Sequence, residues 1–144
     1  MKAKSGFTLV EILIVVVILG ILAAIVIPQF TEASTEAKTS SLCTDLQTMR
    51  SQIELYKIQH NDNLPASAGE DEADFTARMC GQTDINGNAG NDYGPYIQKV
   101  PTNQFVDSND IEIGAGAPGG GNAGWYFNTT TGAFHADDDP HSAL

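Results

Sequence analysis

The order of apolar and polar residues divides the chain into an apolar first part and a mixed remainder. An apolar run extends from Phe7 to Ile27 and is followed by Pro28. About 20 apolar residues suffice for a helix to cross the hydrocarbon core of a bilayer. A helix that is apolar on all sides must be buried in lipid or in protein. Residues 7–30 are therefore predicted to form a transmembrane or filament-core helix.

A one-sided apolar stripe follows the run. Its members lie three or four residues apart: Leu42, Leu46, Met49, Ile53 and Tyr56. This spacing is typical of one packed face of a helix. A helix from Phe7 to about His60 would be roughly 80 Å long at about 1.5 Å per residue. Pro28 lacks an amide proton and restricts the backbone of the residue before it, which predicts a kink there.

The remainder of the chain has short periodic segments between turn-forming residues. The pattern predicts a short helix within 67–79, with Phe75 and Met79 on one side. A strand is expected at 111–113. Two β-prone runs, 125–127 and 133–135, flank a glycine-containing turn and predict a hairpin.

These elements predict an α+β protein with three parts. Residues 1–6 form a leader, 7–30 the apolar helix, and 31–144 one head in which the long helix packs on a small antiparallel sheet. A remainder of this length supports one modest core.

The charge balance argues against a nucleic-acid partner. Seven Lys and Arg residues oppose 18 Asp and Glu, a net charge of −11, and Lys2 and Lys4 belong to the leader. Binding the phosphate backbone of a nucleic acid requires a basic surface, which the head lacks. Basic residues before the apolar run predict that the N-terminus stays in the cytoplasm and the head outside.

Glu11 is the only ionisable residue in the apolar run. A charge deep in lipid costs a few kcal/mol or more, which makes such a residue a functional candidate. A residue near the headgroups could instead extend its carboxylate to the membrane surface. No catalytic constellation accompanies Glu11, and an enzyme is not predicted.

Residues 4–11, Lys-Ser-Gly-Phe-Thr-Leu-Val-Glu, with the apolar run and Pro28 after them, resemble the prepilin signal of the type IV pilin superfamily. The resemblance implies that a prepilin peptidase cuts after Gly6 and N-methylates Phe7. It also implies that Glu11 serves subunit assembly and that Pro28 is the helix kink.

This resemblance implies a structural subunit that polymerises into a helical filament. The expected partners are identical copies, minor pilins or pseudopilins, the prepilin peptidase and the inner-membrane assembly platform. An amine on Phe7 of one copy could neutralise Glu11 of its neighbour, since two costly charges would then be paired. A pair within one chain is also conceivable.

The segments 94–103 and 124–132 are similar to the head of G-type major pseudopilins of type II secretion. The glycine-rich stretch 114–124 departs from that head. The choice between a secretion pseudopilus and a surface pilus for adhesion, motility or DNA uptake stays open. A different class of function is a monomeric binding module tethered to the membrane.

Two further sites are expected in the head. Cys43 and Cys80 would close a loop of about 38 residues and stabilise the head by roughly 3–4 kcal/mol if they form a disulfide. Two free thiols are the alternative. Major pseudopilins hold calcium in the C-terminal region, and carboxylates there supply the oxygen ligands that calcium prefers. The candidate ligands are Asp107, Asp110, Glu112, Asp137 and Asp138.

Overall fold

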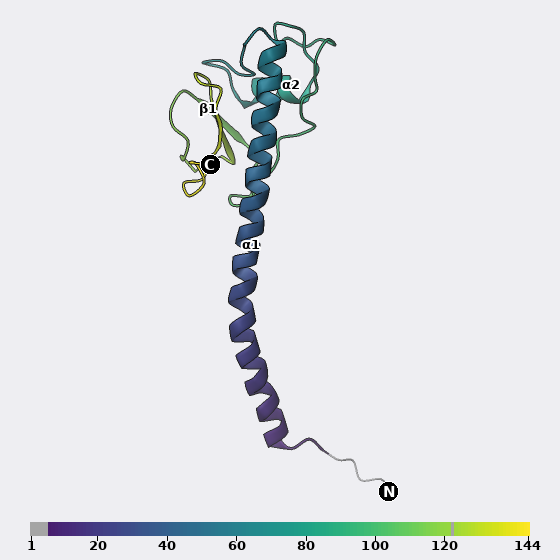
Figure 1. Ribbon diagram of the computed structural model, residues 1–144, viewed down its shortest axis with the longest axis vertical. Coiled ribbons are helices and arrows are strands. Elements are labelled where there is room, and N and C mark those ends of the chain that lie inside the picture. Colours follow the sequence, from purple (N-terminus) through teal and green to yellow (C-terminus); the bar gives the residue numbers. More distant parts are fainter. Residues whose placement is uncertain (1–5, 122) are drawn as a thin grey trace. The chain divides into compact units, whose positions relative to one another are not determined.

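The computed structural model describes residues 6–121 and 123–144. It contains two helices and three strands (Figure 1): α1 Leu9–Gln59, α2 Glu72–Cys80, β1 Ile111–Gly114, β2 Trp125–Asn128 and β3 Phe134–Ala136. The chain divides into two compact units, up to Ala37 and from Lys38 onward. The predicted α+β class is confirmed.

The predicted long helix and its packed stripe are also confirmed. The five stripe residues from Leu42 to Tyr56 are the buried residues of α1. The helix ends at Gln59, where Asn61 and Asp62 adopt positive φ values of 54° and 64°. Such left-handed residues stop an α-helix, and Asn and Asp tolerate this conformation better than most residues.

The second helix starts later than predicted. It begins at Glu72 rather than near residue 67 because Gly69, at a φ of 92°, cannot continue a helix. Asp71 caps it by accepting the backbone N–H groups of Ala73 and Asp74. The predicted inward face is confirmed, since Phe75 and Met79 are both buried.

The sheet is mixed rather than antiparallel, which corrects the prediction. β2 lies between β1 and β3, pairs with β3 as the predicted hairpin, and pairs with β1 in parallel. Parallel neighbours need a long connection that returns the chain to the starting edge. The glycine-rich stretch 115–124 supplies it. Gly124 lies so close to the Ser108 carbonyl oxygen that a Cβ atom would collide with it.

Aromatic residues complete the core beside the α1 stripe. Trp125, Phe127, Phe134 and Phe75 are fully buried in one cluster with the stripe residues. The Phe75 and Phe127 rings lie 4.9 Å apart, and the Trp125 indole N–H donates to the Pro101 carbonyl oxygen at 2.8 Å. The strands and the segment before them are thereby tied to one core.

Candidate functional site

The N-terminal end of α1 lies directly after the predicted cleavage position. Gly6, Phe7 and Thr8 precede the helix, and the Phe7 side chain is 80 % exposed. The other residues of the predicted leader, 1–5, lie outside the described residues. Cleavage after Gly6 and methylation of Phe7 stay predictions.

Thr8 and Glu11 form a reciprocal cap on this end of the helix. The Glu11 backbone N–H donates to Thr8 Oγ1 at 3.3 Å. In return, Glu11 Oε2 accepts the Thr8 backbone N–H at 2.8 Å and the Thr8 hydroxyl at 2.7 Å. This is the capping box of a Thr-x-x-Glu sequence, which satisfies two otherwise unpaired backbone donors. The Thr8-x-x-Glu11 spacing is the sequence signal for this cap, whereas the prediction for Glu11 rested only on its charge within the apolar run.

The cap uses only one oxygen of the carboxylate. Both Thr8 contacts end on Oε2, and no described residue donates a hydrogen bond to Oε1. Glu11 is exposed in the isolated chain. Its second oxygen is therefore available to a donor from outside the chain.

The apolar side chains that follow Glu11 are uncovered within the chain. All residues from Gly6 to Ala37 are exposed, including the apolar run. Among the described residues, α1 is the one helix long and apolar enough to cross a membrane. Pro28 lies inside α1, so the helix continues through it. The kink stays a prediction.

The predicted disulfide is absent, because Cys43 and Cys80 are both free. A disulfide needs Cα atoms within about 7 Å of each other. Cys43 is exposed on α1, whereas Cys80 closes α2 beside Met79, whose carbonyl oxygen accepts the Tyr96 N–H at 2.9 Å. Tyr96 in turn donates its hydroxyl to Gln59, at the far end of α1 from Cys43. These contacts tie the end of α2 that carries Cys80 to the Gln59 end of α1, away from Cys43.

The five predicted calcium ligands have unlike environments. Asp107, Asp110 and Glu112 are exposed, while Asp137 and Asp138 are buried. The described residues contain no group of three or more His, Cys, Asp or Glu side chains placed to hold a metal ion. The set therefore does not fit one calcium site in this arrangement.

Asp137 instead organises the glycine-rich connection. Its carboxylate oxygens accept backbone N–H groups of Gly119 at 2.9 Å, Gly120 at 3.1 Å and Ala123 at 3.2 Å. Several backbone donors around one carboxylate compensate for its burial. The loop between the parallel strands is thus fixed by an anion of the chain itself.

Asp138 is held by side chains rather than by the loop. One of its oxygens accepts the Asn103 amide at 2.8 Å, and the other contacts His141 Nδ1. Asn103 also donates to the Gly124 carbonyl oxygen at 3.0 Å. This network joins the segment after Pro101 to the end of the chain.

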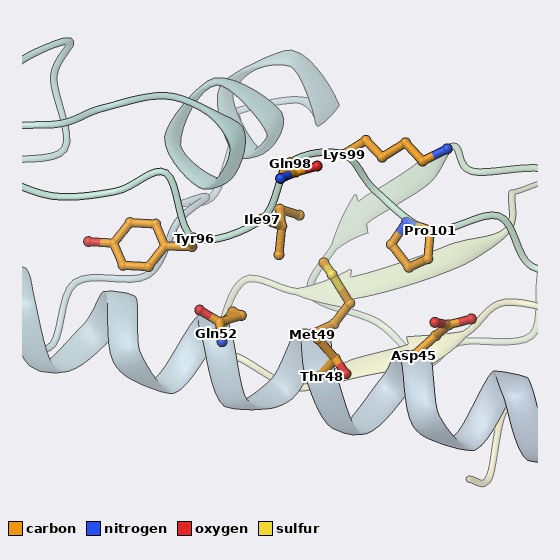
Figure 2. Close-up of a pocket in the computed structure, with 9 residues that line it drawn as sticks. All are labelled: Asp45, Thr48, Met49, Gln52, Tyr96, Ile97, Gln98, Lys99 and Pro101. Carbon is orange, nitrogen blue, oxygen red and sulfur yellow. The ribbon is translucent and has the colours of Figure 1, made fainter.

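A groove of about 270 Å³ lies between α1 and the segment 96–101 (Figure 2). Met49, Ile97 and Pro101 give it an apolar lining, and Asp45 and Lys99 contribute charge from opposite walls. Burial raises the pKa of the Asp45 carboxyl above its ordinary value.

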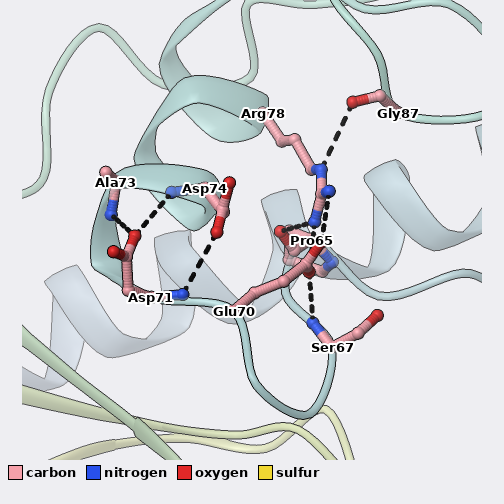
Figure 3. A network of polar contacts seen from close by, with 8 residues as sticks. All are labelled: Pro65, Ser67, Glu70, Asp71, Ala73, Asp74, Arg78 and Gly87. Atoms are coloured by element: carbon pink, nitrogen blue, oxygen red, sulfur yellow. Dashed lines mark hydrogen bonds and ion pairs between the residues drawn. The ribbon is translucent and has the colours of Figure 1, made fainter.

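A bidentate ion pair joins Glu70 to Arg78 (Figure 3). Two parallel contacts of 2.6 Å connect the guanidinium and the carboxylate. Arg78 also donates to the carbonyl oxygens of Pro65 and Gly87, while Ser67 N–H donates to Glu70. Hydrogen bonding by Arg78 lowers the pKa of Glu70 from 4.5 to about 2. This pair fixes the turn before α2.

We expect Glu70→Gln to lower the free energy of unfolding by about 1–2 kcal/mol at neutral pH, because a bidentate charged pair is lost. The Glu70 pKa is lower in the folded chain than its ordinary 4.5. Its stabilising effect is therefore complete above about pH 4.5 and fades as the pH falls towards 2. Urea unfolding of the full chain in detergent micelles, followed by Trp125 fluorescence, measures the difference.

The matched control for this variant is Glu54→Gln, which removes the exposed Lys57–Glu54 pair. Exposed pairs contribute little, so a change below about 0.5 kcal/mol is expected. Equal effects of the two substitutions, or a Glu70 effect that persists at pH 2, would contradict this account of the ion pair.

Calcium binding by the C-terminal carboxylates has a direct test in thermal unfolding. We expect millimolar calcium or a chelator to move the melting temperature by less than about 1 °C, because ligand binding stabilises only where a site exists. Asp137→Asn serves as the control that the assay senses this region, since it places an amide donor among N–H groups. A calcium-dependent rise of several degrees would show that the carboxylates gather around the ion.

Comparisons with known proteins concern the N-terminal part of the chain. Residues 1–27 match the family described as the prokaryotic N-terminal methylation motif. The type II secretion system core protein G of Pseudomonas aeruginosa is 42% identical over 59 residues, 41% of this chain and 42% of that protein. The core protein G of Aeromonas hydrophila is 35% identical over 60 residues, 42% of each chain. A fimbrial protein of Pseudomonas aeruginosa is 32% identical over 71 residues, 49% of this chain and 46% of that protein.

These matches span less than half the length of the curated relatives. No solved structure matches the chain. The similarity covers the region that carries Gly6, Phe7 and Glu11 and confirms the resemblance stated for that region. The N-terminal region of this chain thus matches the prokaryotic N-terminal methylation motif and is similar to core protein G of type II secretion systems.

Proposed function

We propose that this chain is a structural subunit, a major pseudopilin or pilin, that polymerises into a helical filament after cleavage behind Gly6 and methylation of Phe7. Residues 7–30 of neighbouring copies would pack together in the filament core. The identity to core protein G exceeds that to the fimbrial protein and favours a secretion pseudopilus. A surface pilus is the alternative machine.

The observation that carries the proposal is the divided use of the Glu11 carboxylate. Oε2 caps the helix of its own chain, and Oε1 has no donor among the described residues. Cleavage would create an ammonium group at Phe7, directly before Thr8 and four residues before Glu11. Oε1 of one copy could then receive the Phe7 ammonium of a neighbour without breaking the Thr8 contacts. Each buried charge would gain a partner.

The exposed apolar surface supports the same proposal. Nothing within residues 6–37 covers the side chains of the run. Lipid would cover them before assembly, with the N-terminus in the cytoplasm and the head outside the inner membrane. Identical helices would cover them in the filament, where Gly20, with open space around its Cα, allows close approach.

The remaining partners follow from the proposed assembly route. A prepilin peptidase would cut and methylate the subunit, an inner-membrane platform would add it to the filament, and minor subunits would complete the assembly. The relatives themselves are named as a secretion system core protein and a fimbrial protein.

Mass spectrometry of the chain isolated from its host separates a filament subunit from a tethered monomer. We expect a mature chain that starts at N-methylated Phe7, because the N-terminal region matches the methylation motif. Replacing Gly6 by a larger residue should leave the leader attached. A fully retained Met1 in the unaltered chain would contradict the proposal and favour the permanently tethered module.

The role of the Glu11 charge is tested with variants that separate capping from pairing. Glu11→Gln keeps an oxygen that can accept the Thr8 N–H but loses the negative charge. We expect it to reduce filament yield by about tenfold or more, as an unpaired ammonium in a buried site costs several kcal/mol. Quantitative immunoblotting of sheared filaments measures the yield against the amount in the membrane.

The control for this experiment is Thr8→Ser, which preserves the hydroxyl and the capping box and should leave the yield near normal. Normal assembly of Glu11→Gln would show that the cap suffices and that the charge has no partner in the filament.

A further inference from the structure

Lys99 differs from the other cations of the head. Among the described residues it is the one Lys or Arg that makes no hydrogen bond or ion pair with the chain. The other four are occupied by carbonyl oxygens or carboxylates: Lys38, Arg50, Lys57 and Arg78. Lys99 is exposed on an otherwise acidic head. A carboxylate from outside the chain is its natural partner.

The free ammonium lies beside an apolar groove. Met49, Ile97 and Pro101 line the cavity of about 270 Å³, and Lys99 stands on the wall opposite α1 (Figure 2). Asp45 on the α1 wall disfavours a second carboxylate there. A fitting occupant therefore combines apolar side chains with one acidic group placed on the Lys99 side.

The head carries such a combination at the end of α1. Ile58, at 75 %, is the most exposed large apolar side chain from Lys38 onward, and Leu55 on the preceding turn is 40 % exposed. Asp62 follows in the turn after the helix and is exposed. We call Leu55, Ile58 and Asp62 the ridge.

The ridge and the groove of one chain cannot meet. Met49 and Ile58 are nine residues apart on α1, which places them on opposite sides of a helix with about 3.6 residues per turn. A contact between ridge and groove must therefore join two copies. Because the two surfaces differ, the contact is heterologous and leaves a free ridge and a free groove at its ends, as a filament requires.

We propose that the groove is a docking site for a second copy of this chain, whose Leu55 and Ile58 cover the apolar lining and whose Asp62 pairs with Lys99. The proposal rests on the filament function proposed above. The three ridge residues are far fewer than the roughly 20–30 residues that each side of a stable interface contributes. The contact acts between copies that the apolar helices already hold together, where the effective concentration is high.

Cysteine cross-linking in assembled full-length chains tests this contact. In a Cys43→Ser, Cys80→Ser parent, Ile58→Cys is combined with Gln98→Cys, which is exposed next to Lys99. After diamide oxidation of sheared filaments, we expect about tenfold more cross-linked dimers and higher oligomers than in the control, because docking holds the thiols at high local concentration. The control pairs Gln98→Cys with Ile85→Cys, an exposed apolar residue outside the ridge.

Charge reversal tests the ion pair in the same assay. Lys99→Asp or Asp62→Lys alone should lower the cross-linked fraction about two- to fivefold, and the double reversal should restore it, because exposed pairs contribute up to about 1 kcal/mol.

Filaments without cross-linking above the control would overturn the docking site and leave the filament function standing. An unaltered chain that forms no filaments would overturn that function and this contact with it. Failure of the double reversal to restore would overturn the Lys99–Asp62 pairing.

Discussion

The apolar surface of the first half of α1 is the constraint on which the protein depends. The side chains of the run have no cover among residues 6–37, and exposed apolar patches of this extent do not persist in water. The hydrophobic effect therefore requires a second phase or further chains around this segment. A single apolar run therefore has to be covered by lipid or by other chains, which the proposed membrane and filament stages would supply. The head adds stability but does not relieve this requirement.

The same helix changes its role at the head. From Leu42 to Tyr56 one face is buried by the chain itself, against the aromatic side chains of α2 and the sheet. The polar anchors then fix the segments that lack regular structure. Glu70 and Arg78 hold the turn before α2, and Asp137 holds the connection between the parallel strands. Each anchor is an ionic or charge-assisted contact at a place where glycine leaves the backbone free to move.

Local periodicity explains which features could be predicted from the sequence. The α1 stripe, the inward face of α2 and the β2–β3 hairpin depend on residues close together in the chain, and all three are confirmed. The β1–β2 pairing was predicted wrongly because its direction depends on the path of the glycine-rich loop, which Asp137 sets from 14 residues beyond Ala123. The disulfide was wrong for a related reason. The presence of two cysteines in a sequence does not say whether the fold brings their sulfur atoms together.

The N-terminal site was predicted in part. The sequence singled out Glu11 because a charge in an apolar run costs free energy. That cost alone does not say which groups form hydrogen bonds or an ion pair with the carboxylate. The structure shows that Thr8 satisfies one oxygen within the chain. A carboxylate that was fully satisfied internally would gain little from a neighbour, and one with no internal partner would be costly in the membrane before assembly. In the proposed filament, sharing the two oxygens between the cap and a donor from a neighbouring copy would reconcile stability in the membrane with the demand for a partner after assembly.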